Sequence, residues 1–124
     1  MATNYQRGRA FEYRVRDRLK KDGAAYVMRA AQSKGIVDLL ALWPQSWVTM
    51  GYPEPAPRLV VPAAPWLVQV KYSISGKSGR LSAQDEIELT AVADATGGIP
   101  VLATQGPKGR GVVFTNLRTK EQIA

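Results

Sequence analysis

Six prolines crowd into residues 44–65, and this segment constrains the fold more than any other feature of the sequence. Proline fixes φ and has no backbone N–H, so it interrupts helices and cannot donate to a sheet ladder. We therefore predict a long irregular connection at 44–65, with an extra strand possible only around Leu59–Val61. Such a long loop is uncommon in a compact domain. The only basic residue of this segment is Arg58, so the segment is a poor candidate for binding phosphates.

The segments on either side of this insert predict two helices and five strands. Phe11, Val15 and Leu19 recur at helical spacing within a helix over 4–22 that stops near Gly23. A second helix over 82–96 begins after the N-cap Ser82. Strands are predicted at 25–30, 36–43, 66–73, 99–104 and 111–115. The resulting order is α-β-β-β-α-β-β within a single domain, 1–124. Only one helix lies between strands, so within the α/β class we predict an α+β arrangement, with helices packed on a mixed sheet.

The composition excludes several kinds of chemistry. The chain has no cysteine and no histidine, which removes disulfides, thiolate zinc sites, cysteine nucleophiles and the commonest general base. Catalysis would have to use carboxylates, amides, lysines and hydroxyls, and a metal held by such groups would be hard, such as Mg²⁺ or Mn²⁺. No long apolar run and no signal peptide are seen, so we expect no membrane association.

Positive charge is concentrated at the two ends of the sequence. The net charge is +7; residues 1–37 hold nine Lys/Arg and three acidic residues, and residues 104–124 hold four and one. Residues 38–103 hold four basic and six acidic side chains. A polyanion is the natural partner of such a surface, because each neutralised phosphate releases counterions. Basic charge also aids solubility, so net charge alone leaves both interpretations open.

Glu12 breaks the pattern of the first helix. It lies on the same stripe as Val15 and Leu19, which should face the sheet. A buried carboxylate needs a compensating cation. The alternatives are that Glu12 reaches solvent or pairs with Arg9 or Arg16.

Three further polar residues interrupt apolar strands. Asp38 stands in the run 36–40, where an acidic residue is unusual unless it caps the preceding turn. Gln69 and Lys71 point to the same face of their strand, because side chains alternate along a strand. That face is either a half-exposed sheet surface or a functional site.

Together these residues form the PD-(D/E)XK arrangement, in which an acidic residue on one strand precedes a strand carrying an acid or amide two residues before a lysine. Asp38 and the side-chain oxygen of Gln69 can bind a hard divalent ion, with the backbone carbonyl of Val70 as a third ligand. Glu12 can complete the shell directly or through water. Lys71 can orient or help deprotonate the attacking water and stabilise the developing charge.

Motifs along nearly the whole chain outside 44–65 are similar to those of the archaeal-type Holliday junction resolvases. They are Gly8-x-x-x-Glu12, Arg29…Ser33-Lys34…Asp38-Leu39, Val68-Gln69-Val70-Lys71 and Gly97-Gly98-Ile99-Pro100-Val101-Leu102-Ala103. The resemblance implies a restriction-endonuclease-like core and puts Glu12, Asp38 and Lys71 in the catalytic positions, with Ser33 as the active-site serine. It also implies that Arg7, Arg9, Arg29 and Lys34 contact phosphates. Gln69 departs from the usual glutamate, so we expect weaker metal affinity.

The resemblance implies a Mg²⁺-dependent endodeoxyribonuclease, with Mn²⁺ as a substitute, that resolves four-way (Holliday) DNA junctions by paired phosphodiester hydrolysis. Two strands of a two-fold symmetric junction must be cut, so a homodimer is expected. Ile87, Leu89 and Val92 could supply its interface or simply belong to the core. The expected setting is DNA recombination and repair in the cytoplasm, for a protein of prokaryotic or viral origin.

Contact with the DNA backbone is expected from the basic N-terminal helix and the loops at 75–80 and 105–110. The candidate residues are Arg7, Arg9, Arg14, Arg29, Lys34, Lys77, Arg80, Lys108 and Arg110. Two alternatives stay open: a related nuclease of the nicking, flap or restriction type, and a basic nucleic-acid-binding module without catalytic activity.

Overall fold

The computed structural model describes residues 3–30, 35–49, 58–61, 63–72 and 81–123. The helices and strands are α1 (Asn4–Lys21), β1 (Tyr26–Arg29), β2 (Leu39–Leu42), β3 (Ser46–Thr49), β4 (Arg58–Val61), β5 (Trp66–Lys71), α2 (Ala83–Thr96), β6 (Ile99–Gln105), the 3₁₀ turn η2 (Pro107–Gly109), β7 (Val112–Asn116) and β8 (Glu121–Gln122).

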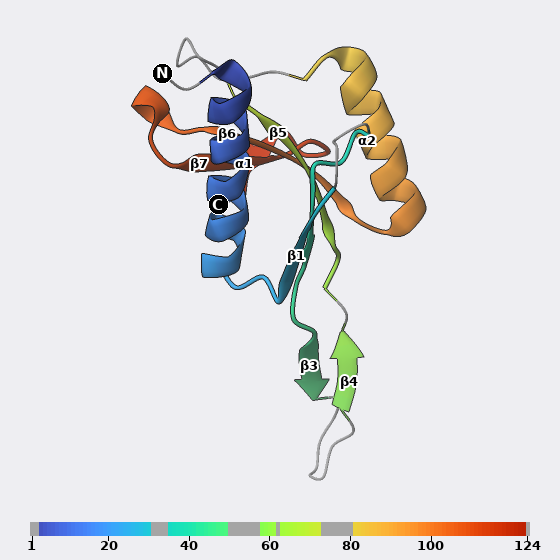
Figure 1. Cartoon of the computed structure of the whole chain (residues 1–124). Helices are drawn as coiled ribbons and strands as arrows, with labels where there is room; N and C mark the ends of the chain where they lie inside the picture. Colours follow the sequence, from blue (N-terminus) through green and yellow to red (C-terminus); the bar gives the residue numbers. More distant parts are fainter. Residues whose placement is uncertain (1–2, 31–34, 50–57, 62, 73–80, 124) are drawn as a thin grey trace.

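Within the described residues, six strands form one mixed sheet in the order β1-β2-β5-β6-β7-β8. Helix α2 connects β5 to β6, which form a parallel pair, and the other neighbouring strands are antiparallel. The two helices lie on opposite sides of this sheet (Figure 1). The predicted mixed sheet with helices packed on it is therefore confirmed.

Helix α1 packs on one face of the sheet. Thr3 caps its start and forms a capping box with Gln6, which satisfies backbone N–H groups that would otherwise lack partners. Phe11, Val15 and Leu19 are 1%, 0% and 0% exposed. Their burial in one apolar cluster with strand residues fixes the helix, and with it Glu12, against the sheet.

Helix α2 packs on the opposite face. Ser82 caps its start, and Gly97 ends it in the left-handed conformation, as expected from the sequence. Leu89 belongs to a second apolar cluster, which also contains Leu67 of β5. Val68 belongs to the cluster under α1, so successive β5 side chains alternate between the two faces.

The prediction of an irregular connection over 44–65 is wrong for Ser46–Thr49, which form β3. Strands β3 and β4 pair antiparallel, from Ser46↔Val61 to Thr49↔Arg58, and this hairpin projects away from the six-stranded sheet (Figure 1). All six prolines lie outside the two strands, so none removes a ladder donor. The extra strand predicted at Leu59–Val61 is present within β4.

Smaller differences concern the ends of elements. The strand predicted over 36–43 is limited to Leu39–Leu42. The loop at 105–110 contains the turn Pro107–Gly109, and the short strand β8 was not predicted. No helix in the described part of the chain is both long and apolar enough to cross a membrane.

Candidate active site

Asp38 lies at the junction between β2 and β5. Its backbone N–H donates to the carbonyl of Val68 at 2.9 Å, and its carboxylate Oδ2 accepts from the backbone N–H of Val70 at 2.8 Å. The side chain thus supplies an acceptor that strand backbone normally provides. Asp38 is only 8% exposed, so the carboxylate is both oriented and largely shielded from water.

Charges from three other elements act on Asp38. Burial raises the pKa of this carboxyl above its ordinary value, and the negative charge of Glu12 raises it further. The hydrogen bond from Val70 and the positive charges of Lys71 and Arg29 oppose this rise in pKa. Glu12, Lys71 and Arg29, from α1, β5 and β1, therefore all lie close enough to influence the ionisation of Asp38.

Glu12 has a cationic partner from β1. Arg29 Nε donates to Glu12 Oε1 at 2.6 Å, and the two side chains are 27% and 12% exposed respectively. Arg29 is the register neighbour of Leu39, the residue after Asp38. The compensating cation expected for Glu12 is thus present, and it is Arg29 of β1.

Gln69 carries an unsatisfied oxygen. Its Oε1 is buried and accepts no hydrogen bond. A buried polar atom without a partner is destabilising and is unusual in a native fold. Alternation along β5 places Gln69 and Lys71 on the face of Leu67, which belongs to the apolar cluster under α2. An electropositive ligand at this point would satisfy the Gln69 oxygen.

The donor set at this junction fits a hard divalent cation. Asp38 offers a carboxylate and Gln69 offers the unsatisfied amide oxygen. The N–H and C=O of a strand residue point to the same neighbour, so the carbonyl of Val70 faces the Asp38 side along with its N–H. Oxygen ligands of this kind suit Mg²⁺ or Mn²⁺. Within the described residues no three His, Cys, Asp or Glu side chains gather at one point.

A cluster around Tyr13 was not foreseen from the sequence. The guanidinium carbons of Arg9, Arg16 and Arg29 lie 5.8, 4.8 and 5.5 Å from the centre of its ring. Arg9 also donates to the Tyr13 hydroxyl, and this bond together with the charge of Arg9 lowers the pKa of Tyr13. The spacing of residues 9, 13 and 16 puts them on one stripe of the helix, so contacts of Tyr13 with Arg9 and Arg16 could have been predicted. Nothing in this spacing predicts the contact with Arg29.

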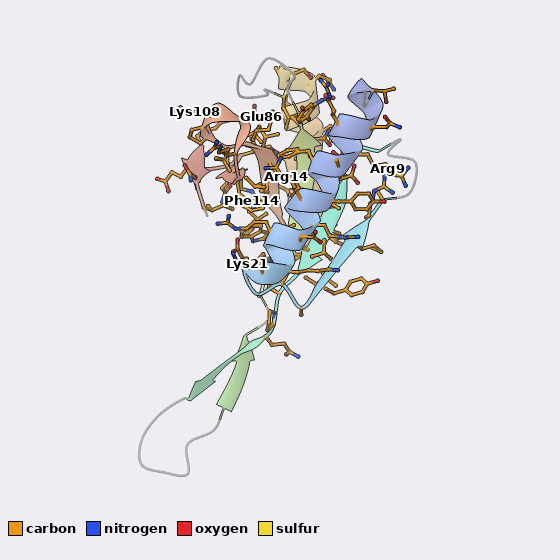
Figure 2. The ribbon with its side chains drawn as sticks, turned by 60° about the vertical axis from the view of Figure 1, so that its left-hand side comes forward. Arg9, Arg14, Lys21, Glu86, Lys108 and Phe114 are labelled. Atoms are coloured by element: carbon orange, nitrogen blue, oxygen red, sulfur yellow. The ribbon has the colours of Figure 1, made fainter. Side chains whose placement is uncertain are left out.

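The predicted DNA contacts do not form one patch among the described residues. Arg9 and Lys108 lie at opposite margins of the view in Figure 2, with Arg14 between them. Arg14 donates to the carbonyl of Gly111 at 3.5 Å and lies over the ring of Phe11. Exposed basic residues continue along α1 and around η2: Arg7, Lys108 and Arg110. Four predicted site residues lie outside the described residues: Ser33, Lys34, Lys77 and Arg80.

Comparison with solved structures identifies a similar fold. A Holliday junction resolvase from the archaeal hyperthermophile Archaeoglobus fulgidus matches with a TM-score of 0.61 and 19% sequence identity, over 90% of this chain and 78% of that chain. The two proteins share a fold. No protein-family model matches the sequence, and no curated protein does. At this level of identity the resolvase supports the architecture, whereas the roles of individual residues must be argued from the geometry above.

Proposed function

We propose that this protein is a metal-dependent endodeoxyribonuclease that resolves four-way DNA junctions. The observation that carries the proposal is the surrounding of Asp38: its buried carboxylate is influenced by Glu12 and Lys71 and is held by Val70, the residue after Gln69, whose side-chain oxygen is unsatisfied. Structural proteins rarely keep a buried acid and an orphan acceptor together, because both are destabilising. The fold shared with an archaeal resolvase supports the same activity.

The residues at this site divide the chemistry among them. Asp38, Gln69 and the carbonyl of Val70 would hold Mg²⁺, and Glu12 would complete the shell directly or through water. When bound, the ion supplies positive charge that polarises the scissile phosphate and favours deprotonation of water. Lys71 orients the attacking water and stabilises negative charge on the phosphate oxygens. Arg29 holds the Glu12 carboxylate in place through their hydrogen bond.

DNA binding relies on charge outside this site. Exposed basic residues along α1 and around η2 contact the phosphate backbone, which favours recognition of DNA shape over base sequence. The contact set comprises Arg7, Arg9, Arg14, Lys108 and Arg110, with Lys34, Lys77 and Arg80 from outside the described residues.

We infer a homodimer, because a two-fold symmetric junction requires two active sites. The apolar surface of β1 and β2 supports this inference. Tyr26, Met28 and Leu42 are 59%, 49% and 42% exposed there. A cavity of about 580 Å³ opens beside them, lined by Met28, Arg29, Ala30, Val37, Leu40, Leu42, Pro65, Leu67 and Thr96. The charged residue in the lining of this cavity is Arg29, and it forms an ion pair with Glu12. The contact between two copies of the chain would therefore bring little unpaired positive charge together.

The other interface candidate, α2, is less suitable. Leu89 is fully buried and Val92 packs against the same core cluster, which leaves Ile87 as the exposed member of the predicted trio. We therefore place the proposed dimer contact on the surface formed by the exposed side chains of Tyr26, Met28 and Leu42 and by the lining of the adjacent cavity. We call it the β1–β2 surface.

Cleavage of a synthetic four-way junction tests the proposal. The full chain with Mg²⁺ should introduce paired, symmetric nicks near the crossover and leave the matching linear duplex intact. Lys71→Met should abolish cleavage while binding the junction with nearly unchanged affinity, and Arg18→Met is a matched control on the outer surface of α1. Equal cutting of duplex would instead indicate a nicking or restriction-type nuclease. Binding without cutting, unchanged in Lys71→Met, would indicate a non-catalytic binding module.

A further inference from the structure

The aromatic ring of Tyr13 lies between the candidate active site and the basic surface of α1. The guanidinium of Arg29 lies over the Tyr13 ring and donates to Glu12, the residue before Tyr13. Arg29 is therefore held at two points, by a carboxylate and by an aromatic face. A long, flexible arginine side chain loses alternative conformations when it is held in this way.

The same tyrosine contacts the basic stripe through a different group. Arg9 donates from Nε and Nη2 to the Tyr13 hydroxyl at 3.4 and 3.3 Å. Arg16 lies over the ring at 4.8 Å while it also pairs with Asp17. The ring thus lies near all three arginines, and the hydroxyl in addition accepts hydrogen bonds from Arg9.

We propose that Tyr13 is a positioning residue with two separable actions: its ring holds Arg29 on Glu12 beside the reaction centre, and its hydroxyl holds Arg9 toward a backbone phosphate of the DNA. The inference rests on the proposed nuclease function, because it assigns Arg29 to the reaction and Arg9 to DNA binding. It adds a residue that touches neither metal nor scissile phosphate. The contact of the ring with Arg29 should affect kcat, and the contact of the hydroxyl with Arg9 should affect substrate binding.

Two substitutions separate these actions. Tyr13→Phe keeps the ring and removes the hydroxyl, so kcat should stay within about two-fold of the wild type while KM for the junction rises. Tyr13→Leu removes both groups, so kcat should also fall about five-fold, the loss expected for one cation–π contact. Arg18→Leu, on the same helix with its own ion pair to Asp22, should keep the wild-type kcat.

A double-mutant cycle tests whether the ring acts through Arg29. In an Arg29→Gln background, Tyr13→Leu should cause no further loss of kcat, because the group that the ring positions is gone. An undiminished five-fold loss in that background would overturn the proposal, as would equal kcat values for Tyr13→Leu and the wild type. A loss of kcat in Tyr13→Phe as large as in Tyr13→Leu would also overturn it.

A second measurement does not depend on cleavage. The side-chain Nε–H signal of Arg29 in a ¹⁵N NMR spectrum should exchange slowly with water in the wild type and Tyr13→Phe, and about five-fold faster in Tyr13→Leu. Tyr13 belongs to neither apolar cluster of the described residues, so Leu should leave the fold intact, which thermal unfolding verifies. A wild type that cuts no DNA would defeat the proposed function alone. Unchanged Arg29 exchange in Tyr13→Leu would defeat the positioning role alone.

Discussion

Asp38 is ionisable at a position where burial opposes its charge. Burial and the charge of Glu12 raise its pKa, and the hydrogen bond from Val70 only partly compensates. The folded chain without metal therefore holds a proton on Asp38 more readily than the unfolded chain does. By linkage, stability decreases as the pH rises from the ordinary pKa of aspartate through the raised value, and it stays lower above that value.

Asp38→Asn should consequently stabilise the metal-free protein at pH 7. Asparagine keeps an acceptor for the Val70 N–H and removes the buried charge, so the free energy of unfolding should rise by ~0.5–2 kcal/mol. Denaturant unfolding measures this difference, which should disappear as the pH approaches the ordinary pKa of aspartate. The same variant should not cleave DNA.

Asp17→Asn is the matched control for this stability change. Asp17 is exposed, and its ion pair with Arg16 lies on the surface, so the free energy of unfolding should change by less than about 0.5 kcal/mol. A lower free energy of unfolding for Asp38→Asn than for the wild type at pH 7 would contradict the view that the buried charge of Asp38 destabilises the metal-free fold.

Gln69→Glu tests whether the unsatisfied amide oxygen is a metal ligand. A carboxylate at this position adds negative charge to the donor set, so the affinity for Mn²⁺ should increase by about ten-fold or more. Without metal the variant should be less stable than the wild type, because it places a third acid near Asp38 and Glu12. Titration calorimetry with Mn²⁺ measures the affinity, and Gln45→Glu, at an exposed position, should leave it unchanged.

At this scale, part of the site was predictable from the sequence. Asp38, Gln69 and Lys71 stand out because each interrupts an apolar strand, and alternation alone puts the last two on one face. The partner of Glu12 was not predictable, because Arg29 reaches it across two elements and 17 residues of sequence. The buried state of the Gln69 oxygen likewise depends on packing that no local pattern encodes.

At the scale of elements, the β3–β4 hairpin is separate from the sheet that carries the site. β2 and β5 pair directly, with Ala41 opposite Trp66, so their ends already lie beside each other where the hairpin leaves. Trp43 packs against Trp66 with ring centres 4.6 Å apart, and this contact belongs to the main body. The hairpin thus extends the connection between β2 and β5, and a short loop could replace it.

Replacing residues 44–63 with Asn-Gly should therefore keep the fold. We expect the melting temperature to stay within about 4 °C of the wild type, which corresponds to ~1 kcal/mol for a chain of this size. Thermal unfolding followed by circular dichroism measures it. A replacement that begins at Trp43 should be clearly more destabilising, because it removes the ring contact. Collapse of the fold in the shorter replacement would show that the hairpin stabilises the sheet.

The hairpin also shows why sequence patterns described the elements incompletely. Clustered prolines correctly excluded a central strand at 44–65, but they flank β3 and β4 instead of interrupting them. The helices were predicted well because caps and apolar spacing are local: Ser82 and Gly97 bound α2 as expected. Strand β8 has only two residues, Glu121 and Gln122, which is too short for a periodic pattern.

At the scale of the whole molecule, we expect the positive charge and the apolar β1–β2 surface to have different partners. The charge suits DNA, whereas the β1–β2 surface carries few groups that could contact phosphates. Helix α2 covers the sheet over β5 and β6 and leaves Met28 and Leu42 exposed. Burial of such side chains is favourable, so a second copy of the chain is the partner we expect.

Met28→Lys should convert the dimer into a monomer. A lysine at the centre of this surface would bring two like charges together across a two-fold axis. Sedimentation velocity at about 10 μM should show a dimer for the wild type and a monomer for the variant. Ile87→Lys, on the exposed side of α2, should remain a dimer. A wild-type monomer, or dimers in both variants, would exclude the β1–β2 surface as the contact.

We propose that Glu12, Asp38, Gln69 and Lys71 surround one site for a hard cation. Anomalous scattering from a crystal soaked in Mn²⁺ tests it most directly. We predict an anomalous peak within coordination distance, about 2.0–2.3 Å, of Asp38, Gln69 Oε1 and the carbonyl of Val70. The peak should be absent in Asp38→Asn. A wild-type crystal in which Mn²⁺ binds only elsewhere, with Gln69 Oε1 still unsatisfied, would contradict the account.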